Sequence, residues 1–303
     1  MLYIVATPIG NLKDITLRAL DVLKSVDLIL AEDTRQTKKL LMRYEINKPV
    51  QSYHQHSRLQ KIDWILDLLQ AGKNIALVTD SGTPGICDPG NQLIEYLMNN
   101  ASNVIPACDV IPAEVEDTRQ SAGIYGGESP IKLGMTSTME ITPIPGPCAL
   151  IAALSVSGLP TDKFLFLGFP PAKRKRQKFF EQAINSKYTV VFYESCHRIL
   201  RTLEDLGVIL NAAERSEESR VSQPLAGHGP GSLRHRWSYG RHAVGRRLRL
   251  PQDDNTRQIV VCRELTKKFE TIYRGSCEDI AEQLKKENHE PRGEFVVMVA
   301  ATT

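Results

Sequence analysis

VTDSGTPGICDPG, residues 78–90, joins two stretches with different hydrophobic patterns. The apolar run 75–78 before it predicts a buried strand, and residues 92–98 after it predict a helix. In open α/β sheets, ligands bind at the carboxyl ends of strands. Glycines let this loop approach a ligand, prolines restrict its shape, and Asp80 supplies a carboxylate. We interpret the segment as a binding loop, with a plain surface turn as the alternative.

Strand-like and helix-like segments alternate along the rest of the chain. The predicted strands cover residues 2–6, 26–31, 75–78, 141–144, 164–167, 189–193, 259–262 and 295–300. The predicted helices cover residues 15–23, 59–69, 92–98 and 150–157, with others starting at 173, running through 206 and starting at 278. This alternation indicates an α/β fold with parallel or mixed sheets flanked by helices. A Gly-Leu-Pro break at 158–160 predicts two domains, 1–158 and 159–303.

Two segments do not follow the alternation. Residues 101–140 lack clear periodicity, and residues 212–256 carry arginine but no lysine among their basic residues. Unstructured stretches of this length are unusual inside a compact domain. We interpret both segments as insertions, one in each domain.

The bulk composition favours a cytoplasmic enzyme. The chain has 303 residues, of which 42% are hydrophobic and 24% charged, as in ordinary globular proteins. Its net charge of +3 means that any surface for nucleic acid is local. No apolar run is long enough to span a membrane, and the amino terminus does not have the pattern of a signal peptide. The scattered cysteines form no C-x-x-C pair, so we expect reduced thiols and no metal site.

Three further polar motifs follow predicted strands. TPIGNL at 7–12 contains Gly10, which allows a close turn over a ligand, and AEDTR at 31–35 contains Glu32 and Asp33. PIPGPCA at 143–149 opens a helix whose free N–H groups suit a carboxylate or a ribose oxygen. The alternatives are ordinary turns, with Asp33 capping a helix and Arg35 pairing with an acid. No G-x-G-x-x-G is present, so a Rossmann dinucleotide site is not expected.

The second half of the chain carries a compact basic cluster, KRKR at 173–176. We place it at a helix start, where positive charge is unfavourable for the helix dipole, and this suggests phosphates as partners. A solvated helix face is the alternative. YESCHR at 193–198 and RELTKK at 263–268 also follow predicted strands, although both can be plain surface charge pairs.

Eight motifs in order resemble the ribosomal RNA small subunit methyltransferase I family of the tetrapyrrole-methylase superfamily. They are TPIGNL, AEDTR, VTDSGTPGICDPG, PIPGPCALIAALSVSGLP, GFPPAKRKR, FYESCHRI, RELTKKFE and GEFVVMV. The resemblance covers residues 1–100, 141–211 and 257–303, and the two insertions depart from the family pattern. It implies two α/β domains with S-adenosylmethionine (SAM) between them, usually in a homodimer. It also implies 2′-O-methylation of a cytidine in the decoding region of 16S rRNA, on the RNA or on the small ribosomal subunit.

The resemblance also implies the site residues. SAM would lie on Pro8, Gly10, Asp80, Ser81, Gly82, Thr83, Cys148 and Ala149, with Tyr193 closing the site from the second domain. A ribose 2′-hydroxyl is a poor nucleophile, so a polar group should help to remove its proton. The candidates for this role, among which the sequence does not choose, are Glu32, Asp33, Glu194, Glu264 and Lys267. For contacts to RNA phosphates we expect Arg35, Lys173, Arg174, Arg176 and Arg198.

Three rival functions are consistent with parts of the sequence. A tetrapyrrole C-methyltransferase would share the fold but would have no need of the basic cluster. An RNA-binding protein disabled by its insertions would bind SAM without transferring a methyl group. A nucleotide hydrolase would use the acidic loops and require Mg²⁺.

Overall fold

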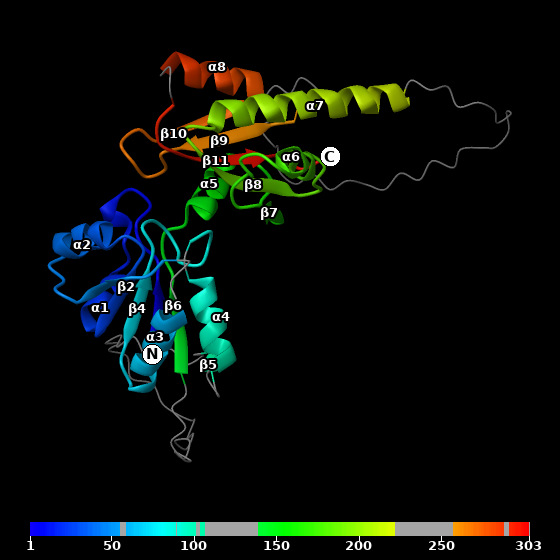
Figure 1. Cartoon of the computed structure of the whole chain (residues 1–303). Coiled ribbons are helices and arrows are strands. Elements are labelled where there is room, and N and C mark those ends of the chain that lie inside the picture. The colour runs from blue at the N-terminus through cyan, green and yellow to red at the C-terminus, as the bar shows by residue number, and fades with distance from the viewer. Residues whose placement is uncertain are drawn as a thin grey trace, which may run out of the picture. The chain divides into compact units, whose positions relative to one another are not determined.

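This computed structural model describes residues 1–54, 59–88, 90–100, 104–106, 139–221, 257–287 and 291–302. The chain divides into two compact units, Met1–Ala149 and Leu150–Thr303 (Figure 1). The division falls just after the first residue of the helix α5 (Ala149–Ser157), whereas the sequence suggested a boundary after that helix. The domain limits inferred from the Gly158 break therefore stay a prediction.

The N-terminal unit is built on a six-stranded sheet in the order β3-β2-β4-β1-β6-β5. Every neighbouring pair is parallel. The strands are β1 (Leu2–Val5), β2 (Leu28–Ala31), β3 (Val50–Ser52), β4 (Ile75–Val78), β5 (Val104–Pro106) and β6 (Met139–Ile144). In β1 and β4 successive side chains point to opposite faces and nearly all are buried, which explains their uninterrupted apolar sequences.

Helices cover both faces of this sheet. Residues of α1 (Leu17–Ser25) and α2 (Thr34–Arg43) share a core with Val5, Ala76 and Val78. Residues of α3 (Leu59–Gln70) and α4 (Asn91–Asn100) share the opposite core with Leu2, Ile4 and other residues of the sheet. The two cores hold the sheet rigidly, so that the loops at its carboxyl edge start from fixed points.

The C-terminal unit contains a five-stranded mixed sheet in the order β10-β9-β11-β8-β7. Only β7 and β8 pair in parallel. The strands are β7 (Phe164–Phe166), β8 (Thr189–Ser195), β9 (Ile259–Arg263), β10 (Thr271–Gly275) and β11 (Glu294–Val299). Helices α6 (Arg176–Ile184), α7 (Ile199–Val221) and α8 (Cys277–Glu287) share one core with β8, β9 and β11.

The predicted α/β class with helix-flanked sheets is confirmed, but several elements differ from their expected limits. The strands β3, β5 and β10 were not predicted, and β5 and the start of β6 fall inside the first expected insertion. The helix expected from Lys173 begins at Arg176, and α7 continues to Val221, into the second expected insertion. Residues 101–103, 107–138 and 222–256, the remainder of the two insertions, lie outside the described residues. None of the helices described is both long enough and apolar enough to cross a membrane.

Candidate functional site

Three glycine-bearing loops meet at the carboxyl ends of the neighbouring strands β4, β1 and β6. Thr7 and Gly82 form an isolated antiparallel bridge, in which the N–H of Thr7 lies 2.8 Å from the Gly82 carbonyl and the return bond is 3.1 Å. The hydroxyl of Thr83 donates to the Pro147 carbonyl at 3.2 Å. The loops that carry Gly10, Asp80 and Cys148 therefore belong to one cluster, although their binding of SAM stays a prediction.

Two of the glycines in this cluster have geometric reasons to be there. Gly82 has a φ of +89°, in a region that favours glycine. A Cβ atom at Gly146 would lie 3.0 Å from the Cβ of Ala6, so any larger residue would push the loops after β1 and β6 apart. These glycines let the backbones of the neighbouring loops lie close together.

Carboxylates surround the tips of β2 and β4. The hydroxyl of Thr79 donates to Oε2 of Glu32 at 2.9 Å, and the N–H of Asp33 donates to Oδ1 of the exposed Asp80 at 2.9 Å. Burial raises the pKa of Asp88 to about 6, and the charges of Glu32 and Asp80 act in the same direction. Sequence reasoning did not single out Asp88, although its place in the same Gly/Pro-rich loop was a signal.

Asp33 has a structural role at the start of α2. Its Oδ1 accepts the N–H of Arg35 at 2.8 Å, and its Oδ2 lies 3.0 Å from Nη2 of Arg35. Hydrogen bonds from Arg35 lower the pKa of Asp33. The helix-cap alternative thus describes its contacts, and a carboxylate held in this way is a weak base. The side chain of Arg35 remains 86% exposed.

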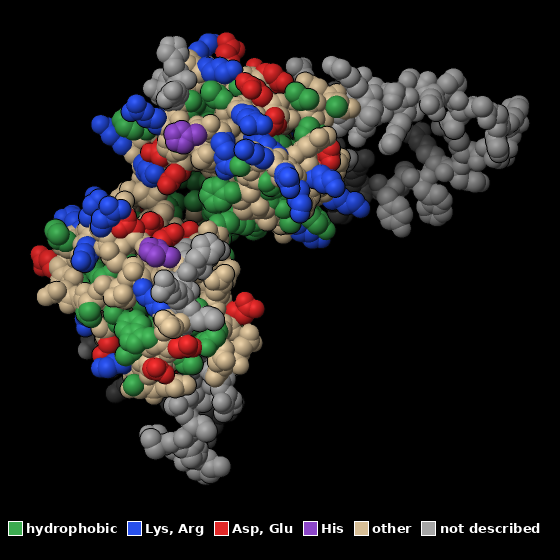
Figure 2. Space-filling model, viewed as in Figure 1, with side chains coloured by type: hydrophobic (Ala, Val, Ile, Leu, Met, Phe, Trp, Pro, Cys, Tyr) green, Lys and Arg blue, Asp and Glu red, His purple; other side chains and the backbone are tan. Residues whose placement is uncertain are grey.

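An open pocket of about 320 Å³ lies at the ends of β2 and β3. On the N-terminal unit, Figure 2 shows acidic side chains gathered near a histidine. The pocket is lined by Glu32, Asp33, Thr34, Arg35, Ser52 and His54. It brings Glu32, a predicted catalytic candidate, together with the exposed cation of Arg35.

Tyr193 anchors the first turn of α5. Its hydroxyl accepts the N–H of Leu150 at 3.1 Å, so this helix N–H is already occupied. Its ring makes edge-on contacts with Phe166 and Phe169, at centroid distances of 5.0 and 5.5 Å. These contacts lie within the C-terminal unit, and the predicted contact of Tyr193 with SAM is untested.

Glu264 and Lys267, two further catalytic candidates, belong to an ion-pair cluster. Nζ of Lys267 lies 2.9 Å from Oε1 of Glu264 and 2.9 Å from Oε2 of Glu294. Burial by itself would lower the pKa of Lys267, but the hydrogen bonds to both glutamates raise it. A protonated lysine held by two carboxylates does not fit the role of a base.

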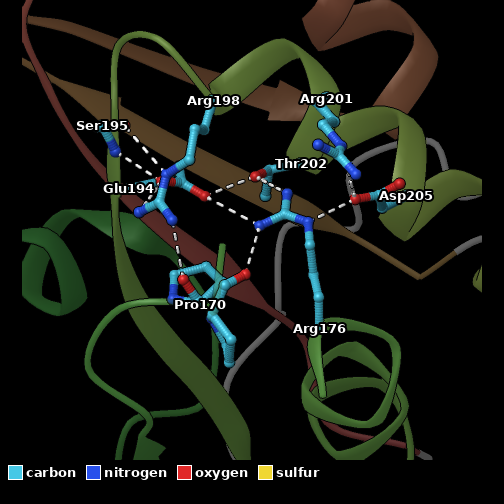
Figure 3. Close-up of polar contacts among 9 residues, drawn as sticks. Pro170, Arg176, Glu194, Ser195, Arg198, Arg201, Thr202 and Asp205 are labelled. Atoms are coloured by element: carbon cyan, nitrogen blue, oxygen red, sulfur yellow. Dashed lines mark hydrogen bonds and ion pairs between the residues drawn. The ribbon is translucent and has the colours of Figure 1, made fainter. Parts of the chain in front are cut away.

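Glu194 lies at the centre of a buried network shown in Figure 3. Its side chain has no exposed surface and lies 2.8 Å from Nη2 of Arg198 and 3.8 Å from Nη1 of Arg176. The hydroxyl of Thr202 donates to Oε2 of Glu194 at 2.6 Å. A carboxylate enclosed in this way is inaccessible to a ribose, so we do not keep Glu194 as a catalytic candidate.

The basic cluster splits between the surface and the interior. Arg176 is only 6% exposed and donates to Oδ2 of Asp205 at 2.7 Å. Its expected contact with RNA phosphate does not fit this burial. The other three cations, Lys173, Arg174 and Lys175, are exposed. They precede α6 and do not lie within its first turn, where the sequence placed them. Among the residues that the structure describes, no group of three or more His, Cys, Asp or Glu side chains is placed to hold a metal ion.

Residues 1–113 and 124–281 match the sequence profile of the tetrapyrrole (corrin/porphyrin) methylases. The chain belongs to this family. Ribosomal RNA small subunit methyltransferase I of Escherichia coli O157:H7 is 36% identical over 299 residues, covering 98% of this chain and 77% of the relative. The protein of that name from Synechocystis sp. is 36% identical over 304 residues, covering 100% of this chain and 80% of the relative. The family resemblance inferred from the eight motifs is confirmed.

Solved structures show the same fold. A cobalt-precorrin-4 methyltransferase, a cobalamin biosynthetic enzyme, superposes with a TM-score of 0.55 at 14% identity, covering 99% of this chain and 94% of its own. The methyltransferase CobJ gives a TM-score of 0.54 at 15% identity, with the same coverage. At such identities the likeness concerns the fold alone, and it confirms the two-sheet α/β architecture of this methylase family.

Proposed function

We propose that this protein is a SAM-dependent methyltransferase that methylates the 2′-hydroxyl of a cytidine in the decoding region of 16S rRNA. The observation that carries the proposal is the 36% identity to a ribosomal RNA small subunit methyltransferase I across 98% of the chain. The strand-end loops of the N-terminal unit and the exposed cations of the C-terminal unit supply the chemistry that this reaction needs.

The loops after β1, β4 and β6 fit SAM. Gly10 and Gly146 are exposed and leave the backbone beside them open to a ligand, and the exposed carboxylate of Asp80 is suited to accept hydrogen bonds from hydroxyl or amino groups. Ser81, Thr83, Cys148 and Ala149 are partly exposed in the same cluster. When bound, SAM supplies an electrophilic methyl group carried on a sulfonium.

Glu32 is our choice for the group that accepts the ribose proton. It lines the open pocket beside Arg35, and Thr79 orients one of its oxygens. The other acidic candidates cap a helix, form a surface ion pair or are buried in the Glu194 network. Within the chain's own chemistry, Glu32 would hold the hydroxyl in position and take its proton, and Arg35 would stabilise a nearby phosphate.

RNA phosphates are the partners that we assign to Lys173, Arg174 and Arg35. All three side chains are exposed, whereas the guanidinium of Arg198 is engaged by Glu194, Ser195 and the Pro170 carbonyl. The tetrapyrrole methyltransferase alternative gives no reason for the run of cations before α6. We further propose a cytoplasmic location, where small ribosomal subunits are found, and a homodimer, as the family resemblance implies.

The test is transfer of a labelled methyl group from SAM to small ribosomal subunits that lack the modification, followed by nuclease digestion and mass spectrometry. A 2′-O-methylcytidine in the decoding region is the expected product. Binding of SAM without methyl transfer would support the alternative of a disabled RNA-binding protein. Methyl transfer to a tetrapyrrole precursor instead would support a tetrapyrrole C-methyltransferase.

A further inference from the structure

We propose that residues 169–175, the loop between β7 and α6, form a docking loop for single-stranded RNA. In this loop Phe169 stacks on an unpaired base, and Lys173 and Arg174 contact the flanking phosphates. The inference rests on the proposed function, because it assumes that RNA is the substrate. It adds a base-contacting residue, and a reason for the shape of the loop, to the phosphate contacts already assigned.

Phe169 has an exposed aromatic ring that packs against the ring of Tyr193. Half of its surface, 52%, is open to solvent. The ring meets Tyr193 edge to face, with a centroid distance of 5.5 Å and an interplanar angle of 60°. Tyr193 is itself held by Phe166 and by the N–H of Leu150. Single exposed apolar residues are common, but an anchored ring on a basic loop offers a stacking surface for a base.

The cations lie on the same loop, a few residues along the chain. Lys173, Arg174 and Lys175 are all exposed, whereas the next residue, Arg176, is buried. Lys175 has a φ of +65°, and this left-handed residue redirects the chain before the helix begins. The loop therefore presents three positive charges to solvent and turns the fourth inward. Figure 2 shows Lys and Arg side chains gathered on this unit.

The buried network fixes the backbone of the loop. Nη1 of Arg198 donates to the Pro170 carbonyl at 3.0 Å, and Nη1 of Arg176 donates to the Pro171 carbonyl at 3.3 Å. Both arginines pair with Glu194, so two successive carbonyls of the loop are tied to one buried carboxylate (Figure 3). The Tyr193 N–H also donates to the Gly168 carbonyl at 2.8 Å, just before the loop.

Such a network is costly to bury, and apolar residues of similar volume often stabilise a fold equally well. Its effect here is to pre-organise the loop, which reduces the ordering entropy lost on binding. An aromatic ring beside cations is suited to single strands, whose bases are free to stack, more than to duplex RNA, whose bases are already stacked. These observations together favour an unpaired RNA segment as the occupant.

The experiment measures the affinity of the full chain for a fluorescein-labelled single-stranded oligoribonucleotide with the decoding-region sequence, at several salt concentrations. We expect Phe169→Ala to weaken binding about tenfold without changing the salt dependence, because stacking releases no counterions. Phe169→Trp should bind like the wild type. Lys173→Ala with Arg174→Ala should reduce the slope of log K against log[salt] by about 1.4, since each contact to a single-strand phosphate contributes about 0.7.

Arg201→Ala is the matched control. Arg201 is 68% exposed on α7 and makes only a 3.9 Å contact with Asp205 within the network. Its loss removes the same charge as Arg174→Ala and should leave affinity within about twofold, as for most surface substitutions. Calorimetry with SAM and a thermal melt on each variant confirm that the fold and the cofactor site are intact.

The outcomes separate this inference from the proposed function. If the wild type methylates small subunits but Phe169→Ala binds the oligonucleotide as tightly as the wild type, the docking loop is wrong and the function stands. The same conclusion follows if the wild type methylates subunits but does not bind the single strand. If the wild type neither methylates subunits nor binds RNA, both proposals fail.

Discussion

Arg198 holds Glu194 through a 2.8 Å contact between Nη2 and Oε1, and the Glu194 side chain is entirely buried. The two residues are four apart in sequence, a spacing that suggested a surface ion pair. They instead form the centre of a network in which Thr202 and Arg176 engage the second carboxylate oxygen. Burial changes what this pair does, because a buried charge that loses its partner is far more costly than an exposed one.

We expect Glu194→Ala to lower the free energy of unfolding of the protein by about 3–5 kcal/mol, since it leaves two guanidinium groups without their buried partner. Urea denaturation measures the effect. The matched control is Glu204→Ala, which removes a 62% exposed carboxylate 3.5 Å from Lys285 and should cost about 0.5 kcal/mol or less. Equal losses in the two variants would show that the network contributes no more than a surface pair.

Asp33 is predicted to act on stability and not on the methyl-transfer step. Asp33→Ala removes the side chain that accepts the Arg35 N–H, so the urea midpoint should fall. Asp33→Asn keeps an accepting oxygen at the cap and should retain most of the stability and the turnover number. A turnover number that collapses in the stable Asp33→Asn variant would return Asp33 to the catalytic candidates.

Glu32→Gln tests the role that we assign to its carboxylate. An amide of the same shape can still accept the Thr79 hydroxyl hydrogen bond but cannot take a proton. We expect the single-turnover rate constant of methyl transfer to fall by about 10²–10⁴ while the affinities for SAM and RNA stay near the wild-type values. Single-turnover kinetics on small subunits provide the measurement, with Asp33→Asn as the control. Unchanged kinetics would exclude Glu32 as the base.

Asp80→Ala should weaken SAM binding at least tenfold in calorimetry, because hydrogen bonds to a charged group contribute about 1.5–3 kcal/mol. The Asp33 N–H also loses its acceptor, so the stability of the variant must be measured alongside. Asp80→Asn, which keeps an acceptor for that N–H, separates the two effects. Near-normal affinity in a folded Asp80→Ala protein would remove Asp80 from the cofactor site.

The raised pKa of Asp88 predicts a pH dependence of stability. Because burial raises this pKa to about 6 in the folded protein, the folded state binds the proton more tightly than the unfolded state. The stability contributed by Asp88 is therefore present below about pH 4 and is lost as the pH rises through about 6. Relative to the wild type, Asp88→Asn should become more stable across this window in urea unfolding.

Asp27→Asn provides the control for that experiment. A backbone hydrogen bond from Asn74 lowers the pKa of Asp27, so this carboxyl titrates below the window. Its substitution should produce no such rise in relative stability between pH 4.5 and 7. A rise of the same size in both variants would assign the pH dependence to a general effect of charge.

The strands β1, β2, β4 and β6 of the N-terminal unit, and the polar loops at their carboxyl ends, could be predicted from sequence because their causes are local. The run Ile75–Val78 is apolar throughout because helices cover both faces of its sheet, and the polar loop after it marks the carboxyl edge. The short strands β3 and β10 carry no such pattern. No residue of β3 is buried, and Tyr273 is the one buried residue of β10; the two strands pair because a neighbouring strand offers its free edge.

By itself, the sequence determined the family, the two-sheet α/β class and the loops in which a cofactor site should be sought, since these follow from periodicity and from motifs in a fixed order. Only the tertiary structure separated Arg176, which is buried, from the exposed Lys173 and Arg174. Adjacent residues of one charge look equivalent along the chain. Arg176 is buried because Glu194, which lies on β8, offers it a buried carboxylate. The left-handed residue Lys175 turns the chain between this arginine and the exposed cations before it.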